Sequence, residues 1–194
     1  MSIKSKIRTI PNYPKDGIMF RDISSLLSDA DGFIETIETL ANRYYEKKDD
    51  FDFIIGIESR GFILGAALAL KLEKGFIMVR KPGKLPGETI EQEYELEYGM
   101  DKIEIQKDAF KPGSKILLVD DLIATGGTLL AAIELIEKIN GEIFGLPIGG
   151  DISFGKNNDK IKGSLNIPKF SFPTELFSKT PLKSKFSNFT SQFN

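Results

Sequence analysis

The stretch that decides the fold runs from Ile116 to Thr128 and reads ILLVDDLIATGGT. Its first four residues are apolar, which is typical of a strand that is buried on both faces. Two carboxylates end this strand, and a turn of small and hydroxyl-bearing residues then opens a helix. The first backbone N–H groups of a helix are unpaired and the helix dipole is positive there, so this turn is suited to bind an anion such as phosphate.

Individual residues of the stretch indicate what it binds. Gly126 and Gly127 allow the backbone to approach a phosphate closely, and the two threonines add hydroxyl donors. Asp120 and Asp121 are unsuited to phosphate but suited to accept hydrogen bonds from two ribose hydroxyls. Neither the Gly-Lys-Ser/Thr end of a Walker A loop nor the GxGxxG pattern of dinucleotide-binding proteins is present. An ordinary strand-to-helix connection with an aspartate N-cap is the alternative.

Patterns on either side of this stretch predict the rest of an α/β domain. A strand, a helix and a second strand in succession favour a parallel sheet with a right-handed crossover. Residues 89–105 alternate imperfectly, which predicts antiparallel strands beside the main sheet. The predicted buried strands are 53–57, 75–79, 115–119 and one that begins at Glu142, and the predicted helices are 33–44, 62–72 and 129–139.

Composition excludes several classes of chemistry. The 194 residues contain no cysteine and no histidine, which excludes disulfides, thiolate nucleophiles, cysteine zinc sites and Ser-His-Asp triads. The net charge of −2 gives no reason to expect nucleic acid or an anionic membrane as a partner. The N-terminus has no apolar signal region, and the longest apolar stretch, Gly61 to Leu70, is about half of the roughly 20 residues that a membrane span needs. These features predict a soluble, cytoplasmic protein.

The stretch Ile116 to Thr128 resembles the phosphoribosyl pyrophosphate signature of type I phosphoribosyltransferases. Five more segments, in order between about Ile7 and Gly145, resemble adenine phosphoribosyltransferases. These segments are Pro14 to Leu26, Glu58 to Phe62, Arg80 to Gly87, Tyr94 to Gly99 and Glu104 to Ala109. The resemblance implies a parallel sheet flanked by helices, with a small N-terminal hood (about 7–28) and a flexible lid loop (about 80–98). It also implies adenine and phosphoribosyl pyrophosphate as substrates, Mg²⁺ as the cofactor, and a homodimer.

The resemblance assigns a role to the hood and to the loop after the first buried strand. Met19 and Phe20 would flank the purine, and Arg21 would lie at its edge. Filling of the core is the alternative for the two apolar residues. Ser59 and Arg60 would bind pyrophosphate through backbone N–H groups and a bidentate guanidinium, unless Arg60 only forms a surface ion pair.

The lid contributes a second set of implied site residues. Arg80 to Gly87 (RKPGKLPG) has three cations, two prolines and two glycines without apolar periodicity, which by itself predicts a mobile surface loop. By resemblance, the cations would meet the pyrophosphate or cross to the partner subunit, and Glu97 would approach the reacting purine nitrogens. Solvated surface positions are the alternative for the lysines and for Glu97. The implied lid residues are Arg80, Lys81, Lys84, Glu97 and Tyr98.

The phosphate loop completes the implied site. Asp120, Asp121, Arg60 and Glu97 would carry the catalytic roles. No protein ligand of magnesium is assigned, because the metal would be held mainly by the substrate. The loop residues that would bind phosphate and ribose are Ala124, Thr125, Gly126, Gly127 and Thr128.

The chain departs from the family pattern after Gly145. Residues 1–150 are predicted to form the phosphoribosyltransferase domain, and 151–194 a divergent tail rich in Lys, Ser and Phe. A divergent folded terminus is one reading of the tail. We expect instead that it is disordered or is read in a shifted frame. Two alternative functions follow: transfer to another purine base, or a non-catalytic relative that binds phosphoribosyl pyrophosphate and is disabled by its altered C-terminus.

Overall fold

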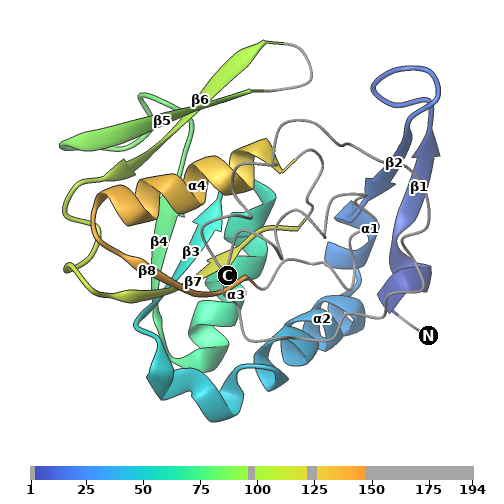
Figure 1. Ribbon diagram of the computed structural model, residues 1–194. Coiled ribbons are helices and arrows are strands. Elements are labelled where there is room, and N and C mark those ends of the chain that lie inside the picture. The colour runs from blue at the N-terminus through green and yellow to red at the C-terminus, as the bar shows by residue number, and fades with distance from the viewer. Residues whose placement is uncertain (1–2, 96–98, 122–125, 147–194) are drawn as a thin grey trace, which may run out of the picture.

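The computed structural model of the chain describes residues 3–95, 99–121 and 126–146. In this part of the chain a parallel sheet carries helices on both faces, and two antiparallel ribbons flank it (Figure 1). The α/β fold with a parallel sheet is therefore confirmed. The predicted tail, 151–194, lies outside the described residues.

The central sheet has the strand order β4-β3-β7-β8, and all its described pairings are parallel. The strands are β3 (Phe53–Ile57), β4 (Gly75–Val79), β7 (Lys115–Val119) and β8 (Glu142–Gly145). The prediction that residues 75–79 form a fully buried strand is wrong. Within the described sheet β4 pairs only with β3, so it forms an edge, and Val79 alone of its residues is buried.

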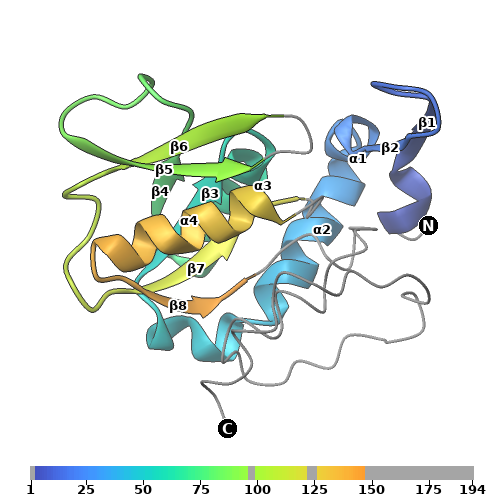
Figure 2. The ribbon, with the colours of Figure 1, turned by 45° about the horizontal axis from the view of Figure 1, so that its top comes forward.

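Helices cover both faces of this sheet (Figures 1 and 2). α3 (Arg60–Leu72) crosses from β3 back to β4, and α2 (Ala30–Asn42) packs beside it on the same face. The short 3-10 helix η2 (Tyr45–Asp50) leads from α2 toward β3. α4 (Gly127–Lys138) lies on the opposite face. Helices α3 and α4 each begin two residues earlier than predicted, so their first turns include residues of the expected site.

The core divides into two clusters because alternate residues of a strand point to opposite faces of a sheet. Ile54 and Leu117 pack in the cluster that contains α2 and α3. Their neighbours Ile55 and Leu118 pack in the cluster that contains α4. All four side chains are fully buried. The two central strands are thus covered on both faces, as their continuous apolar sequences predict.

An N-terminal ribbon forms the region predicted to be the hood. β1 (Arg8–Pro11) pairs antiparallel with β2 (Met19–Asp22), between the 3-10 helix η1 (Ile3–Lys6) and the short helix α1 (Ser24–Leu27). In both ribbon views the N-terminal end of α4 points toward the side of the molecule on which this ribbon lies (Figures 1 and 2). The ribbon therefore lies on the side where the predicted phosphate loop enters its helix.

A second ribbon lies over α4 (Figure 2). It consists of β5 (Thr89–Glu95) and β6 (Met100–Gln106), which are antiparallel, as the alternating sequence predicts. Ile103 and Ile105 of β6 are buried against the α4 side of the core. The segment between β4 and β5 is the predicted lid loop, so one end of the lid is attached to the main sheet and the other to this ribbon.

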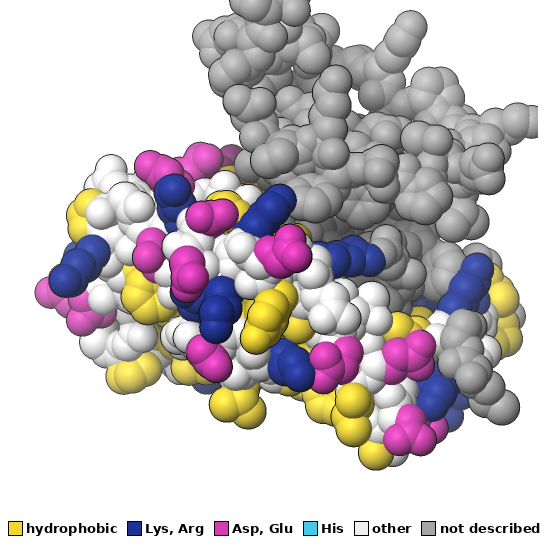
Figure 3. All heavy atoms as spheres, turned by 90° about the horizontal axis from the view of Figure 1, so that it is seen from below, with side chains coloured by type: hydrophobic (Ala, Val, Ile, Leu, Met, Phe, Trp, Pro, Cys, Tyr) yellow, Lys and Arg dark blue, Asp and Glu magenta, His cyan; other side chains and the backbone are white. Residues whose placement is uncertain are grey.

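On the face shown in Figure 3, the described basic and acidic side chains are interspersed with each other and with apolar ones. None of the helices in the described part of the chain has the length and apolar character that crossing a bilayer requires.

Candidate active site

A pocket of about 320 Å³ lies at the carboxyl ends of β3 and β7. These two strands are parallel neighbours, so the loops that follow them meet at one edge of the sheet, where ligands of open α/β folds bind. The β5-β6 ribbon and the loop after β4 supply the remaining walls. The lining residues are Ile57, Glu58, Ser59, Arg60, Lys81, Tyr94, Ile103, Asp120, Asp121 and Thr128.

Two glycines shape this end of the sheet. At Gly61 a β-carbon would lie 2.7 Å from the carbonyl oxygen of Val119, so only glycine lets α3 start this close to β7. Gly126 has a φ of +87° and directly precedes the first residue of α4, a conformation that favours glycine. The two glycines bring the N-terminal ends of α3 and α4 to the pocket, where Arg60 and Thr128 belong to the first turns.

The two aspartates at the end of β7 have different environments. Asp121 is buried, and its Oδ2 lies 3.0 Å from Nε of Arg60. The backbone N–H of Asp121 donates to Oδ1 of Asp120 at 2.8 Å. Burial and the neighbouring charge of Asp121 raise the pKa of Asp120 to about 8. The pocket therefore holds a carboxyl group paired with a guanidinium, beside a second carboxyl group whose ionisation is disfavoured.

Arg60 also connects the pocket with the N-terminal ribbon. Its guanidinium lies 5.8 Å from the centre of the Phe20 ring, a cation–π distance. Met19 is 57% exposed, so it does not fill the core, which removes that alternative for this residue. Arg21 donates from Nη1 to Thr9 within the ribbon. The structure thus places Phe20 beside the site, while none of the three predicted hood residues lines the pocket itself.

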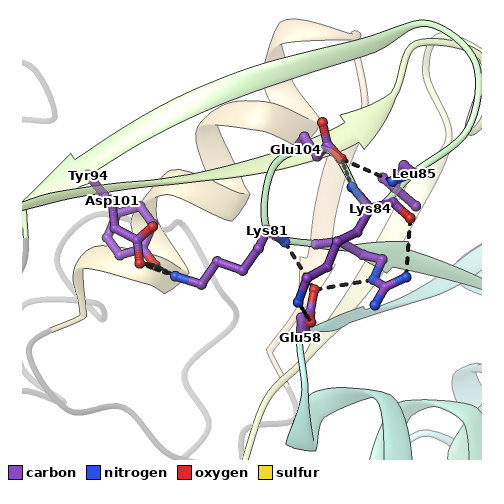
Figure 4. Close-up of polar contacts among 8 residues, drawn as sticks. Glu58, Lys81, Lys84, Leu85, Tyr94, Asp101 and Glu104 are labelled. Atoms are coloured by element: carbon purple, nitrogen blue, oxygen red, sulfur yellow. Dashed lines mark hydrogen bonds and ion pairs between the residues drawn. The ribbon is translucent and has the colours of Figure 1, made fainter.

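The predicted lid loop is tied to the carboxylate of Glu58, which directly follows β3 (Figure 4). Arg80 Nε and the backbone N–H of Lys81 donate to Glu58 Oε2 at 3.2 and 3.0 Å, and Lys84 Nζ forms an ion pair with Oε1. Burial would raise the pKa of Glu58, but these three donors outweigh it and lower the pKa to about 2. Lys84 is thus an exposed lysine whose ammonium group is paired with the carboxylate of Glu58.

Lys81 has a separate set of partners on the β5-β6 ribbon (Figure 4). Its Nζ lies 3.0 Å from the hydroxyl of Tyr94 and forms an ion pair with Asp101. Tyr94 donates to the same carboxylate at 3.1 Å. Lys81, which lines the pocket, thus joins the loop to the ribbon.

Four predicted site residues lie outside the described part of the chain: Glu97, Tyr98, Ala124 and Thr125. Their roles stay predictions. Conversely, sequence reasoning did not single out Glu58, Tyr94, Asp101 or Glu104 as individual functional residues. Three of them stand in segments that carry the family resemblance, which was the available signal. Asp101 lies outside these segments and carried no such signal, because it reaches Tyr94 only through the pairing of β5 with β6.

Comparisons with known proteins agree with this geometry. A family model described as the phosphoribosyl transferase domain matches residues 25–148. The adenine phosphoribosyltransferase of Chlorobium phaeovibrioides is 61% identical over 143 residues, which are 74% of this chain and 81% of that protein. The enzyme of the same name from Prosthecochloris aestuarii is 52% identical over 180 residues, which are 93% of this chain and 97% of that protein.

Solved structures give the same result. The adenine phosphoribosyltransferase of Saccharomyces cerevisiae, in complex with adenine and an imino-altritol bisphosphate, superposes with a TM-score of 0.72. It is 38% identical, and the match covers 87% of this chain and 95% of that one. On the strength of the fold, the pocket and these matches, the chain belongs to the adenine phosphoribosyltransferase family.

Proposed function

We propose that the chain transfers the 5-phosphoribosyl group of phosphoribosyl pyrophosphate to adenine, giving AMP and pyrophosphate in purine salvage. The proposal is supported mainly by the pocket at the carboxyl ends of β3 and β7. It combines the Asp120–Asp121 pair, the Arg60 guanidinium and the first turn of α4 with the cationic loop. Each of these features suits one part of a sugar that bears a phosphate and a pyrophosphate.

In this reaction the bond between C1 of the ribose and the pyrophosphate oxygen breaks, and a bond from C1 to a purine nitrogen forms. Positive charge builds up on the sugar and negative charge on the leaving group. The carboxyl group of Asp121 is placed to stabilise the positive charge on the sugar, and cations such as Arg60 and Lys84 are placed to stabilise the negative charge on the leaving group. The purine nitrogen loses its proton, for which Glu97 is the proposed acceptor. No histidine or thiolate nucleophile is needed, which matches the composition.

The raised pKa of Asp120 has a consequence for substrate binding. A protonated carboxyl group can donate one hydrogen bond and accept another, so Asp120 and Asp121 together can bind both hydroxyls of a ribose. As positive charge develops on the sugar, ionisation of Asp120 becomes more favourable. The pair is therefore suited to respond to the charge that develops during the reaction.

Magnesium is proposed as the cofactor, held mainly by the pyrophosphate of the substrate. In the described ranges no group of three or more acidic side chains is arranged to hold a metal ion. A magnesium ion that is bound through one or two carboxylates and substrate phosphates needs no such group. When bound, the metal would screen the charge of the leaving pyrophosphate.

Adenine is the proposed base because the relatives and the solved structure described above carry it in their names. Transfer to another purine base, and a non-catalytic relative, were the alternatives, and none of these matches supports them. The test is a coupled assay for AMP formation from adenine and phosphoribosyl pyrophosphate with and without Mg²⁺, with guanine and hypoxanthine as competing bases. Product from guanine alone, or no product from any base, would refute the proposal.

A homodimer in the cytoplasm, without nucleic acid or membrane as a partner, is part of the same proposal. The near-neutral net charge and the mixed charges of the face in Figure 3 support the absence of polyanionic partners. Light scattering of the purified chain tests the dimer, since a monomeric mass at micromolar concentration would contradict it.

A further inference from the structure

Glu104 of β6 is a buried carboxylate that the reaction proposed above does not use. It is 3% exposed and faces the loop that follows β4 (Figure 4). Its Oε1 accepts the backbone N–H groups of Lys84 and Leu85, both at 3.1 Å, and its Oε2 accepts the hydroxyl of Thr89 at 3.1 Å. Burial would raise the pKa of Glu104, but donors that include the N–H of Leu85 and Gly83 lower it below its ordinary value.

The backbone of Glu104 forms hydrogen bonds with the start of the same loop. Its N–H donates to the carbonyl oxygen of Arg80 at 2.7 Å, and its carbonyl oxygen accepts the N–H of Arg80 at 3.0 Å. Next along the strand, Gln106 donates from Nε2 to the carbonyl oxygen of Pro86 at 2.9 Å. The loop predicted to be mobile is therefore fastened to β6 at several points, with Glu104 at the centre.

Lys84 is consequently held at two ends. Its backbone N–H binds Glu104 of β6, and its ammonium group binds Glu58, which lines the pocket. In the folded chain the loop backbone thus brings the ammonium group to the edge of the pocket. A carboxylate that accepts consecutive backbone N–H groups fixes a loop in one shape, because each bond would be lost if the loop turned away.

We propose that Glu104 is a positioning residue that fixes the loop backbone so that Lys84 can bind the pyrophosphate group. The inference rests on the proposed function. On binding, the pyrophosphate takes the ammonium group of Lys84 from Glu58, while the bonds from Glu104 to the loop backbone remain. Glu104 itself touches no substrate and acts through Lys84.

Hydrogen exchange tests the anchoring without any need for activity. In Glu104→Gln the amides of residues 83–85 are expected to exchange at least about tenfold faster than in the wild type, because an amide is a weaker acceptor than a carboxylate. Glu91→Gln is the matched control, since Glu91 pairs with Glu104 across the ribbon but is exposed. Equal exchange in the two variants would overturn the anchoring.

Pyrophosphate binding tests the function of the anchor. Calorimetry with Mg²⁺-pyrophosphate is expected to give a roughly tenfold weaker Kd for Lys84→Ala and for Glu104→Gln, as for the loss of one charge-assisted contact. If Glu104 acts through Lys84, the double variant loses about tenfold rather than about a hundredfold. Additive losses, or unchanged affinity of Glu104→Gln, would overturn the inference.

Two further measurements keep the test decisive. If Glu104→Gln does not fold, Thr89→Val replaces it, because this variant removes one donor to the carboxylate and is expected to shift the exchange and the Kd in the same direction, by less. If the wild-type chain binds pyrophosphate but makes no AMP, the proposed function is refuted. The hydrogen-exchange and Kd measurements then still test the positioning role of Glu104. A wild-type chain that does not bind pyrophosphate would overturn the inference as well.

Discussion

Replacing Asp120 by asparagine is expected to stabilise the protein more at alkaline pH than at acidic pH. Asparagine has the shape of the protonated carboxyl group and keeps an oxygen for the N–H of Asp121, which now lies 2.8 Å from Oδ1 of Asp120. The raised pKa of about 8 means that the folded protein holds this proton up to mildly alkaline pH, whereas the unfolded chain releases it near 3.8. Between these values the folded state binds more protons, so stability falls as pH rises and is constant above about 8.

The magnitude follows from the size of this shift. One pKa unit corresponds to about 1.4 kcal/mol, so the change from 3.8 to about 8 sets a ceiling of several kcal/mol. Relaxation and water penetration reduce the cost of a buried charge, and Arg60 offsets part of it, so we expect a gain of about 2 kcal/mol for Asp120→Asn at pH 9. At pH 5 the gain should be well below that at pH 9, because pH 5 lies close to the ordinary pKa of 3.8 and the folded state is uncharged at this position in both proteins.

Urea unfolding at pH 5, 7 and 9 measures the difference by linear extrapolation. Asp49→Asn is the control, since Asp49 is exposed in η2 and far from the pair. The same stability difference at pH 5 and pH 9 would refute the reasoning, and so would a loss of stability at pH 9. A gain in stability with a loss of AMP formation would show that the carboxyl group is kept for the reaction and not for the fold.

Three further predictions concern the site and the tail. Asp120→Asn together with Asp121→Asn should lower turnover at least about a hundredfold with the fold intact. Near-normal turnover at an unchanged melting temperature would remove both residues from the site. Glu58→Gln should lower the unfolding free energy by about 1–2 kcal/mol at pH 6. This difference should shrink as pH falls from 4.5 toward 2, because the depressed pKa of Glu58 stabilises the fold only while the carboxylate is ionised; a difference that stays constant in urea unfolding would contradict it. For the tail, translating the coding DNA beyond the Gly145 codon in the other two frames should reveal an apolar strand followed by an acidic, leucine-containing turn. Finding no such sequence, together with a protease-resistant terminus, would show that the tail diverged as a folded segment.

The sequence by itself determined the class of fold and the place of the site. Short apolar runs, helical periodicity and turn residues are local features, and each depends on neighbours within a few positions. For this reason the strands at 53–57 and 115–119 and the antiparallel ribbon could be predicted. Ligands of open α/β sheets bind at the carboxyl ends of strands, which placed the predicted site at Asp120, and the family resemblance added Arg60.

Only the tertiary structure decided which charged groups meet. Lys84 pairs with Glu58, 26 residues away, and Lys81 with Asp101, 20 residues away, although each has other acidic residues closer in sequence. The raised pKa of Asp120 and the edge position of β4 also depend on what surrounds them in space. Such contacts join segments that are distant in the chain, and no local pattern encodes them. The geometry that holds the loop against Glu104 is therefore a property of the folded molecule.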